Sequence, residues 1–548
     1  MATNDQPQYR TFFGQLFDRV AAWKLGFPPE RCNYTTREVR IPVSDGRSSI
    51  ELCGRLLQPV QDKPLGTVLV RSPYGRGLPM VGMARAYAAR GYQVLSVSCR
   101  GTFGSGGEFE PFWTEVQDGK EVVEWMRQQP WYTGTFATIG SSYLGFTQWA
   151  LLCDPPKDMV AAVPAICPYD FSRPIWGTGA LDLDNMRWVD MVAHQEDPFS
   201  LWESMRKTRV RKLEAIFGGT EPLAQSLLKH NDGRSPWLAT FLTKPDVSDA
   251  FYEPMKLHRA LEQADIPILI ITGWYDLFIE QSMEQYYRLQ ARGCQVALTI
   301  GPWTHMGSGF APQMNLHGFD WVEHHLSKRS AAERSSPVQY FVTGAQQWKE
   351  AAIFPPPTKP TTLFLHHGGQ LLDKPAPSET AASQFTFDPR NPTPTTGGIG
   401  LTASTNGSVD DSALAARSDV LVFDSAPLPA DVELCGKPVV ELTHSTSSPY
   451  ADMFVRVSEV DARGKSRNIS DVFERLDPKR GHVVDLKLGL NHCAHRIVQG
   501  KRIRVMVAGG SFPQFARNHG VENADLNATE MRPVEHTVYH GKLVLPVV

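Results

Sequence analysis

The chain has 548 residues, of which 42% are hydrophobic and 21% are charged, an ordinary composition for a globular protein. This length exceeds the roughly 250–300 residues at which one hydrophobic core stops growing, so we expect two or three domains. A formal net charge of -3 excludes the large basic field that nucleic acid or an anionic membrane would require, and we expect neither as a partner.

The N-terminus and the cysteines indicate a cytoplasmic protein. The first residues are polar and lack the pattern of a secretory signal, and no apolar run reaches the ~18 residues of a membrane span. The eight cysteines are scattered, without the close pairs typical of metal sites, and we expect buried free thiols. We therefore expect a cytoplasmic chain that uses neither a metal nor another cofactor.

Up to about residue 167, strand-like and helix-like segments alternate. The predicted strands cover residues 67–70, 92–98, 136–141 and 159–163. The predicted helices cover residues 79–90, a segment begun by a capping-box variant at Asp118-Gly-Lys-Glu121, and residues 144–153. Strands separated by helices imply right-handed crossovers and a parallel sheet that is covered on both faces.

The alternation stops between residues 168 and 255. Helix-like segments such as residues 201–217 follow one another there without strands, which predicts a helical insertion. The sheet then resumes with strands at residues 266–271 and 296–300. The first of these is a continuous apolar run, which indicates a strand buried on both faces.

The pattern changes again beyond the proline-rich residues 354–360, which no regular helix tolerates. Met453, Val455 and Val457 alternate with other residues at a period of two, and many short strands lie between turn signals. Such a region is typical of a β-sandwich or jelly roll. We therefore divide the chain into a first part of an α/β core (1–167), a helical cap (168–255), a second part of the core (256–353) and a C-terminal jelly-roll domain (354–548).

A candidate nucleophile lies where one predicted strand meets the next helix, in Ile139-Gly-Ser-Ser-Tyr-Leu-Gly145. A serine on such a sharp turn exposes its hydroxyl above the sheet edge, and the residue two places before it must be small. Gly140 precedes Ser142 by two places, whereas the bulky Ile139 precedes Ser141 by two. Ser142 is therefore the better candidate. The alternative to a catalytic role is that this segment is only a glycine turn in which the two serines cap the helix.

Two further side chains follow the strands that resume the sheet. Asp276 comes after the strand at 266–271 and His305 after the strand at 296–300, at carboxyl ends of strands, where open α/β sheets place their sites. A neutral imidazole can take the proton of an attacking serine, and a carboxylate fixes the tautomer of that imidazole. The order Ser142, Asp276, His305 is that of α/β-hydrolases and predicts a catalytic triad.

These segments and others resemble the cocaine-esterase branch of the X-Pro dipeptidyl-peptidase hydrolase family. The resemblance implies a hydrolase core with an inserted helical cap and a C-terminal jelly roll. It also implies an oxyanion hole formed by the backbone N–H of Tyr143 and the hydroxyl of Tyr74, and an acyl pocket lined by Trp176 and Phe278. Besides the segment around Ser142, it rests on Arg71-Ser-Pro-Tyr74, Arg100-Gly-Thr-Phe103, Gln129-Pro-Trp131, Gly273-Trp-Tyr-Asp276, Gly301-Pro-Trp303-x-His305 and Ser511-Phe-Pro-Gln-Phe515.

The chain departs from this family in two places. The family often carries an acidic residue two places before the arginine that corresponds to Arg100, and this chain has Ser98 there. Ser98 cannot form an ion pair with Arg100. We expect no counterpart of the long N-terminal domain typical of the X-Pro peptidases, which favours an esterase over a peptidase.

We therefore predict a serine hydrolase that cleaves a small-molecule carboxylic ester through an acyl-enzyme intermediate. The alternative is an α-amino-acid ester hydrolase, a β-lactam acylase or a dipeptidyl peptidase, in which Asp182, Asp184 and Glu280 are available to hold a substrate ammonium. A second alternative is a non-catalytic carbohydrate-binding protein with an inert core. The sequence names neither the acyl nor the alcohol group, and it leaves the formation of a homo-oligomer open.

Overall fold

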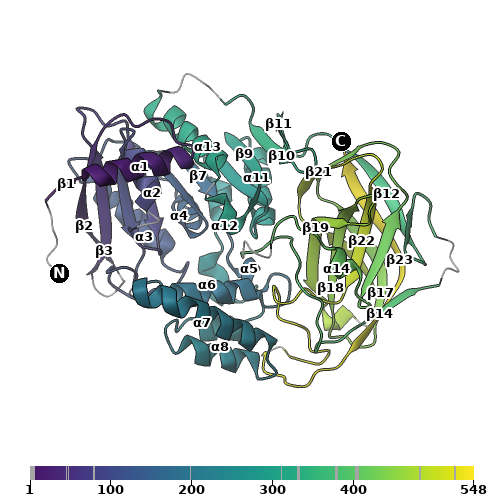
Figure 1. Cartoon of the computed structure of the whole chain (residues 1–548). Coiled ribbons are helices and arrows are strands. Elements are labelled where there is room, and N and C mark those ends of the chain that lie inside the picture. The colour runs from purple at the N-terminus through teal and green to yellow at the C-terminus, as the bar shows by residue number, and fades with distance from the viewer. Residues whose placement is uncertain are drawn as a thin grey trace. The chain divides into compact units, whose positions relative to one another are not determined.

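The computed structural model describes residues 6–548 except 45, 47–48, 78–80, 198, 310, 330–333, 377–380, 402–405, 481–482 and 524–525. The chain forms two compact units (Figure 1). Unit 1 comprises Met1–Phe171, Phe251–Gly273 and Glu280–Gln339, and unit 2 comprises Ser172–Ala250, Trp274–Ile279 and Tyr340–Val548.

Unit 1 is built on a sheet whose strands follow the order β1-β2-β3-β5-β4-β6-β7-β8-β9. The pairs β4–β5, β4–β6, β6–β7 and β7–β8 are parallel, which confirms the predicted parallel sheet for these strands. Strands β1, β2 and β3 extend it by antiparallel pairs, so the sheet as a whole is mixed. Strands β4, β5 and β8 are buried along their whole length, as strands covered on both faces must be. The strands are β1 (Gln8–Tyr9), β2 (Tyr34–Ser44), β3 (Ser49–Pro59), β4 (Thr67–Ser72), β5 (Gln93–Ser98), β6 (Phe136–Ser141), β7 (Met159–Ala165), β8 (Ile268–Tyr275) and β9 (Val296–Thr304).

The helices of unit 1 pack on this sheet in two groups. Tyr87 of α2 and Phe319 of α13 contact each other in one group, and α4 contacts both α3 and α10 in the second. The helices are α1 (Phe12–Lys24), α2 (Val81–Ala88), α3 (Glu115–Arg127), α4 (Tyr143–Leu152), α10 (His258–Gln263), α11 (Ile279–Ala291), α12 (His305–Ser308) and α13 (Pro312–Val322), with short helices at Ala250–Met255 and Glu323–Ser327. The predicted start of the helix at 79–90 lies outside the described residues.

One predicted helix start is wrong. Helix α3 begins at Glu115, not at a capping box formed by Asp118 and Glu121. The Asp118 carboxylate binds an arginine and accepts a hydrogen bond from the hydroxyl of Thr114, which directly precedes the helix. The helix buries Val122, Val123 and Met126.

Unit 2 begins with helices that follow one another without strands, as predicted. They are α5 (Ser172–Trp176), α6 (Leu183–Ala193), α7 (Phe199–Gly218), α8 (Leu223–Asn231) and α9 (Leu238–Thr243). Backbone hydrogen bonds join them to the segment after the strand at 502–508: the Leu183 N–H donates to the Gln514 carbonyl at 2.7 Å, and the Leu223 N–H donates to the Leu526 carbonyl at 2.9 Å. The insertion thus groups with C-terminal residues, and the division into three domains with the boundaries given above stays a prediction.

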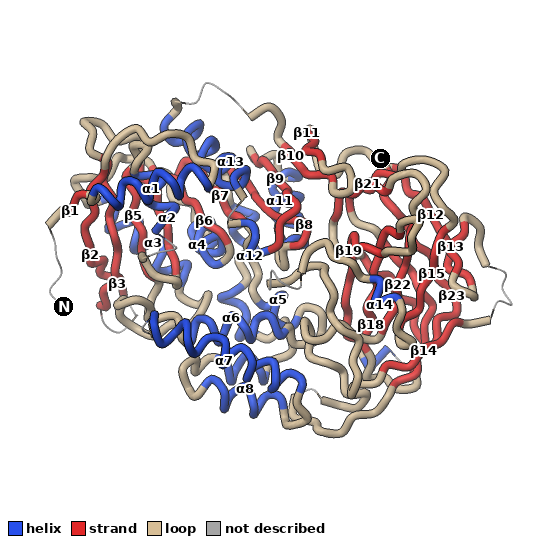
Figure 2. The backbone as a smooth tube through the Cα atoms, viewed as in Figure 1, coloured by secondary structure: helices blue, strands red, loops and turns tan. Residues whose placement is uncertain are grey.

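The remainder of unit 2 is dominated by strands (Figure 2). They are β10 (Val338–Val342), β11 (Gln347–Ala351), β12 (Lys359–His366), β13 (Gln370–Leu372), β14 (Ser383–Phe387), β15 (Val420–Ser425), β16 (Val432–Gly436), β17 (Val439–Thr446), β18 (Asp452–Val460), β19 (Ser466–Arg475), β20 (Val483–Gly489), β21 (Cys493–Ile497), β22 (Arg502–Ala508) and β23 (Val534–Val547), with short helices at Ser412–Ala415 and Pro478–Arg480. Strands β12 to β23 form a sheet of their own, which is the predicted C-terminal β-sandwich.

The core of the sandwich explains the alternation in its sequence. Met453, Val455 and Val457 of β18 belong to the larger apolar cluster. Phe454, on the opposite face of the same strand, belongs to a second cluster, in which the rings of Phe473 and Phe515 stack at 4.1 Å. The period of two is therefore correct, but β18 is buried on both faces instead of one.

Other general features are consistent with the composition. All eight cysteines lie in described parts of the chain as free thiols, and six of them are buried. Among the described residues, no helix combines the length and the apolar content that crossing a bilayer requires. The same part of the chain holds no group of three or more His, Cys, Asp or Glu side chains placed to bind a metal ion.

Candidate active site

Ser142 forms the turn between β6 and α4 by itself. Strand β6 ends at Ser141 and α4 begins at Tyr143, and Ser142 has φ +59° and ψ -125°. A side chain in this region of backbone space is strained and persists only when the surroundings hold it. The Ser142 N–H donates to the Ala165 carbonyl at 2.9 Å, and the Ser142 carbonyl accepts from the Gly145 N–H at 2.9 Å. The turn presents the half-buried Ser142 at the end of the sheet.

Two glycines allow α4 to approach the sheet at this turn. A Cβ atom on Gly140 would collide with the Cβ of Leu144, which explains why a small residue is needed two places before the serine. A Cβ atom on Gly145 would collide with the Cys167 side chain. Gly145, one place later than the second glycine of the usual motif, is therefore needed for this close contact.

His305 lies within hydrogen-bond distance of the candidate nucleophile. It follows the last residue of β9 and begins α12, whose start is capped by the Thr304 hydroxyl, which accepts from the Gly307 N–H. The His305 Nε2 and the Ser142 Oγ are 3.1 Å apart, and His305 is 7% exposed. An imidazole at this distance can take the serine proton as the hydroxyl attacks.

Asp276 lies at the carboxyl end of the strand that neighbours β9. It directly follows Tyr275, the last residue of β8, and is fully buried. Its Oδ2 accepts the Phe278 N–H at 3.2 Å, and its carbonyl accepts the Ile279 N–H at 3.1 Å where α11 begins. These bonds hold Asp276 in the turn between β8 and α11. Its role as the partner of His305 stays a prediction.

The two tyrosines predicted for the oxyanion hole are neighbours. Tyr74 follows β4, the strand beside β6, and its ring lies 6.3 Å from that of Tyr143 in an edge-on arrangement. The Tyr143 hydroxyl donates to Glu115 Oε1 at 2.8 Å and accepts the Phe112 N–H at 2.9 Å. Burial, and next the Glu115 carboxylate, raise the pKa of Tyr143 well above its ordinary value. Its phenol therefore stays protonated and anchors the first residue of α4.

Glu115 is a further residue near the site, and no local sequence signal marks it. Its Oε2 accepts a hydrogen bond from the Arg71 guanidinium at 2.5 Å, while Oε1 accepts from Tyr143. The side chains of Arg71 and Glu115 are 2% and 3% exposed. Arg71 belongs to a quoted family segment, but Glu115 lies 44 residues away, and an acidic residue in the first turn of a helix is ordinarily explained by the helix dipole.

Arg100 has an ion pair that the sequence analysis did not expect. Its Nη2 and Nε bind the two oxygens of the buried Asp118 carboxylate at 2.5 and 3.1 Å. The acidic partner therefore comes from α3 instead of the position two residues before Arg100. Ser98, which stands at that position, accepts a hydrogen bond from Arg76 at 2.5 Å.

The residues predicted for the acyl pocket are both buried. Trp176 is 3% exposed, and its indole N–H donates to the Phe241 carbonyl at 2.8 Å. Phe278 is 5% exposed and follows Asp276 by two residues. Their contact with a substrate stays a prediction.

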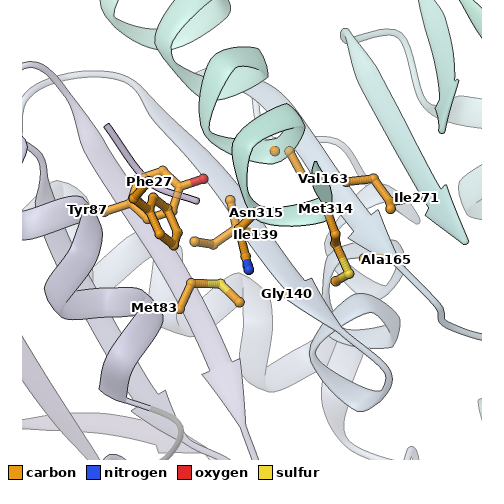
Figure 3. Close-up of a pocket in the computed structure, with 11 residues that line it drawn as sticks. Phe27, Met83, Tyr87, Ile139, Gly140, Val163, Ala165, Ile271, Met314 and Asn315 are labelled. Carbon is orange, nitrogen blue, oxygen red and sulfur yellow. The ribbon is translucent and has the colours of Figure 1, made fainter. Parts of the chain in front are cut away.

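A small cavity lies behind the nucleophile turn (Figure 3). It has a volume of about 30 Å³, and Gly140, Met83, Met314 and Asn315 are among the residues that line it. A cavity of this size holds about one water molecule. It is too small for an acyl group.

The geometry defines the class of the protein. A strained serine between a parallel strand and a helix, with an imidazole at 3.1 Å from its oxygen, is the arrangement of an α/β-type serine hydrolase.

Comparison with known proteins identifies the family. Residues 45–307 match the model of the X-Pro dipeptidyl-peptidase family (S15), and residues 330–543 match the model of the X-Pro dipeptidyl-peptidase C-terminal non-catalytic domain. The chain belongs to this family of serine hydrolases. It is 24% identical to cocaine esterase from a Rhodococcus species over 575 aligned positions, which cover 94% of this chain and 99% of that protein.

Solved structures show the same fold. An α-amino acid ester hydrolase superimposes with a TM-score of 0.80 at 20% identity, over 94% of this chain and 97% of the other. An aminopeptidase from a marine sediment archaeon of the Thaumarchaeota superimposes with a TM-score of 0.77 at 21% identity, over 94% and 96% of the two chains. The fold is thus an α/β-hydrolase core with a helical insertion and a C-terminal jelly roll, as predicted.

Proposed function

We propose that this protein hydrolyses carboxylic esters through an acyl-enzyme intermediate. The observation that carries the proposal is the 3.1 Å contact between His305 Nε2 and Ser142 Oγ on the strained turn. The similarity to cocaine esterase along nearly the whole chain supports an ester as the substrate.

The chemistry follows from the roles that these groups can take. Ser142 Oγ forms a bond to the ester carbonyl carbon while His305 Nε2 takes its proton. The C–O bond to the alcohol then breaks, and the imidazolium returns the proton to the leaving oxygen. A water molecule, deprotonated by His305, releases the acid in the second half of the cycle. Asp276, at the end of the strand beside β9, holds the imidazole in the required tautomer.

Two donors stabilise the negative charge that attack places on the carbonyl oxygen. These are the backbone N–H of Tyr143, next to the nucleophile, and the hydroxyl of Tyr74. The adjacent rings of the two tyrosines support this assignment, because both residues follow neighbouring strands of the sheet. Losing one such donor typically raises the barrier by about 3 kcal/mol.

A pair of serine variants tests the proposal. With a nitrophenyl ester as the substrate, Ser142→Ala should lower kcat by at least about 10⁴-fold, because the other groups cannot replace the nucleophile. The matched control is Ser141→Ala, one residue earlier, which should retain most of the activity and still react with a fluorophosphonate probe. Loss of activity in Ser141→Ala with retention in Ser142→Ala would refute the assignment.

The structure disfavours two of the three carboxylates named for amino-ester and amide substrates. Asp182 caps α6 by accepting the Asp184 N–H, and Asp184 binds Arg187 at 2.6 Å and the Leu401 N–H at 2.8 Å. Burial, and next the Asp184 carboxylate, raise the pKa of Asp182 well above its ordinary value. A neutral or already paired carboxyl binds an ammonium poorly, so we expect similar rates for an α-amino ester and its desamino analogue.

A further inference from the structure

Helix α1 turns Asp18 and the small Ala22 toward the protein, while its large apolar side chains face solvent. The inward side carries Asp18, which is 7% exposed. Seven large apolar side chains at the helix and just before it are exposed: Tyr9 (66%), Phe12 (76%), Phe13 (80%), Leu16 (53%), Phe17 (52%), Val20 (47%) and Trp23 (76%). We call these seven residues the α1 patch. A helix on the surface of a monomer normally has the opposite orientation.

Directed bonds fix this orientation. The Asp18 carboxylate accepts hydrogen bonds from the Tyr34 hydroxyl at 2.7 Å and from Arg10 at 3.1 Å, and it pairs with Arg85 at 3.3 Å. Arg10 also binds Glu30 at 2.9 Å. Rotating the helix to bury its aromatic side would break the bonds of Asp18 and take this partner away from Arg10 and Arg85.

The chain on both sides of α1 is also anchored. Tyr9, in β1, pairs with Thr35 of β2 in the sheet, and Thr11 caps the first turn of the helix. After the helix, the buried Phe27 contacts the rings of Tyr87 and Phe319. Figure 1 shows α1 beside α2, with which it is in contact. The α1 patch is therefore held in place on folded elements at both ends.

The spacing of the patch suits packing against another helix. Phe13, Leu16, Val20 and Trp23 are separated by three, four and three residues, so they form one seam along the helix. Phe12 and Phe17 flank this seam. A seam of this kind is self-complementary across a two-fold axis, where the same patch of each copy meets the other.

The size of the patch agrees with an interface between two copies. Aromatic side chains carry roughly 150–250 Å² each, so the exposed fractions above amount to on the order of 800 Å². The largest apolar patch of a typical monomer is roughly 300–600 Å². A standard interface buries about 800 Å² per partner. We propose that the α1 patch is the interface of a homodimer in which the α1 helices of two copies pack against each other.

The charges around the patch favour a second copy over a membrane surface. Arg19 is tied to Glu30 at 3.1 Å, and the chain as a whole has a net charge of -3. Helices that lie in a membrane interface usually add an excess of Lys and Arg, which attracts anionic lipids. The α1 patch instead is dominated by aromatic anchors, which are typical of protein interfaces.

The test measures the mass of the full-length protein in solution by sedimentation velocity over a range of concentrations. The wild-type chain should sediment as a dimer. Phe13→Glu places a charge in the seam and should raise the dimer dissociation constant by more than about tenfold. Phe13 is 80% exposed in the single chain, so each subunit should still fold and the hydrolysis of a nitrophenyl ester should not change.

Val483→Glu is the matched control, because Val483 is 62% exposed, belongs to β20 and undergoes the same change in charge outside the α1 patch. It should remain a dimer, and Trp23→Gln should weaken the dimer like Phe13→Glu. A monomeric wild type, or a dimer unaffected by both patch variants, would overturn the proposal. So would binding of the wild type, but not of Phe13→Glu, to vesicles of phosphatidylcholine and phosphatidylglycerol, which would assign the patch to a membrane.

Discussion

Each of the two units contains a buried network in which an arginine is paired with a carboxylate, and the two networks have different neighbours. In unit 1, Arg71 binds Glu115, whose second oxygen accepts the Tyr143 hydroxyl. In unit 2, Arg456 of β18 binds Asp471 of β19 at 2.7 Å and lies 3.6 Å from Asp411. The two arginines are 2% and 1% exposed. Each network thus buries charges that are stable only when they are paired.

The neighbours of the two networks differ. Tyr143 directly follows Ser142, so the network in unit 1 fixes the start of α4 beside the candidate nucleophile. Arg456 lies over the Phe454 ring and donates to the Thr396 carbonyl, so it joins β18 of the sandwich to a loop. We expect the first network to affect both stability and catalysis, and the second to affect stability alone.

The largest effect is expected from removing one charge of the network in unit 1. Glu115→Gln keeps the shape of the side chain but leaves the buried Arg71 without a countercharge, which should lower the free energy of unfolding by about 3–5 kcal/mol. The start of α4 should also shift, so kcat for a nitrophenyl ester should fall while KM changes little. Urea unfolding and steady-state kinetics measure the two effects separately.

Asp471→Asn is the matched variant in unit 2. It should lower stability by a similar amount, because Arg456 loses its direct partner, but kcat at a temperature where the variant is folded should equal that of the wild type. Equal losses of kcat in Glu115→Gln and Asp471→Asn would contradict the expectation that only the network in unit 1 affects catalysis.

A smaller effect, on catalysis alone, is expected at the proposed oxyanion donor. Tyr74→Phe removes only the hydroxyl and should raise the barrier by about 3 kcal/mol, seen as a loss of roughly 10²- to 10³-fold in kcat, the cost of one oxyanion donor. Tyr143→Phe is the control, because its proposed donor is the backbone N–H. Its hydroxyl contacts Glu115 and the Phe112 N–H, so this variant should lose mainly stability, by about 1–3 kcal/mol. A larger loss of kcat in Tyr143→Phe than in Tyr74→Phe would contradict the assignment of Tyr74.

The smallest effect concerns two buried histidines of the sandwich. His444 Nε2 and His536 Nδ1 are 3.1 Å apart, and the His536 ring stacks on Phe385. Burial lowers the pKa of His444 to about 4, and burial together with His444 lowers the pKa of His536 to about 3. Below the ordinary histidine value of about 6.5, the unfolded chain takes up protons that the folded chain excludes. The stability that these groups contribute should therefore be complete above about pH 6.5 and fall as the pH drops toward 4.

Replacing one of these histidines should reduce that loss. In His444→Asn, the slope of the unfolding free energy against pH between about 6.5 and 4 should decrease by up to about 1.4 kcal/mol per pH unit. His367→Asn, at an exposed position of the same unit, should leave the slope as in the wild type. Chemical unfolding at several pH values measures both. An unchanged slope in His444→Asn would mean that His444 is not protonated on unfolding in this range.

Much of the site was predictable because its signals are local. The strand at 136–141, the glycine two places before Ser142 and the positions of Asp276 and His305 after apolar strands are all visible in short windows of sequence. The carboxyl ends of parallel strands meet at one edge, so three distant segments could be assigned to one site.

The contacts of Asp118 and Glu115 are not visible in the sequence, for one physical reason. Asp118 was assigned to a helix cap because its neighbours fit the motif, but its carboxylate binds Arg100, which lies 18 residues earlier. Glu115 was overlooked because nothing near it in the chain marks its contacts with Arg71 and Tyr143. In each case the partner comes from another element, and the choice of partner depends on packing instead of local pattern.

The sequence by itself determined the kinds of elements in this protein, their order and the turn that carries Ser142, because backbone propensity and apolar periodicity act over a few residues. Tertiary structure decided which charged groups meet and which apolar faces stay exposed. Arg456 faces Asp471 only because of the register of β18 on β19, and α1 presents its aromatic side to solvent only because Asp18 finds its partners inside.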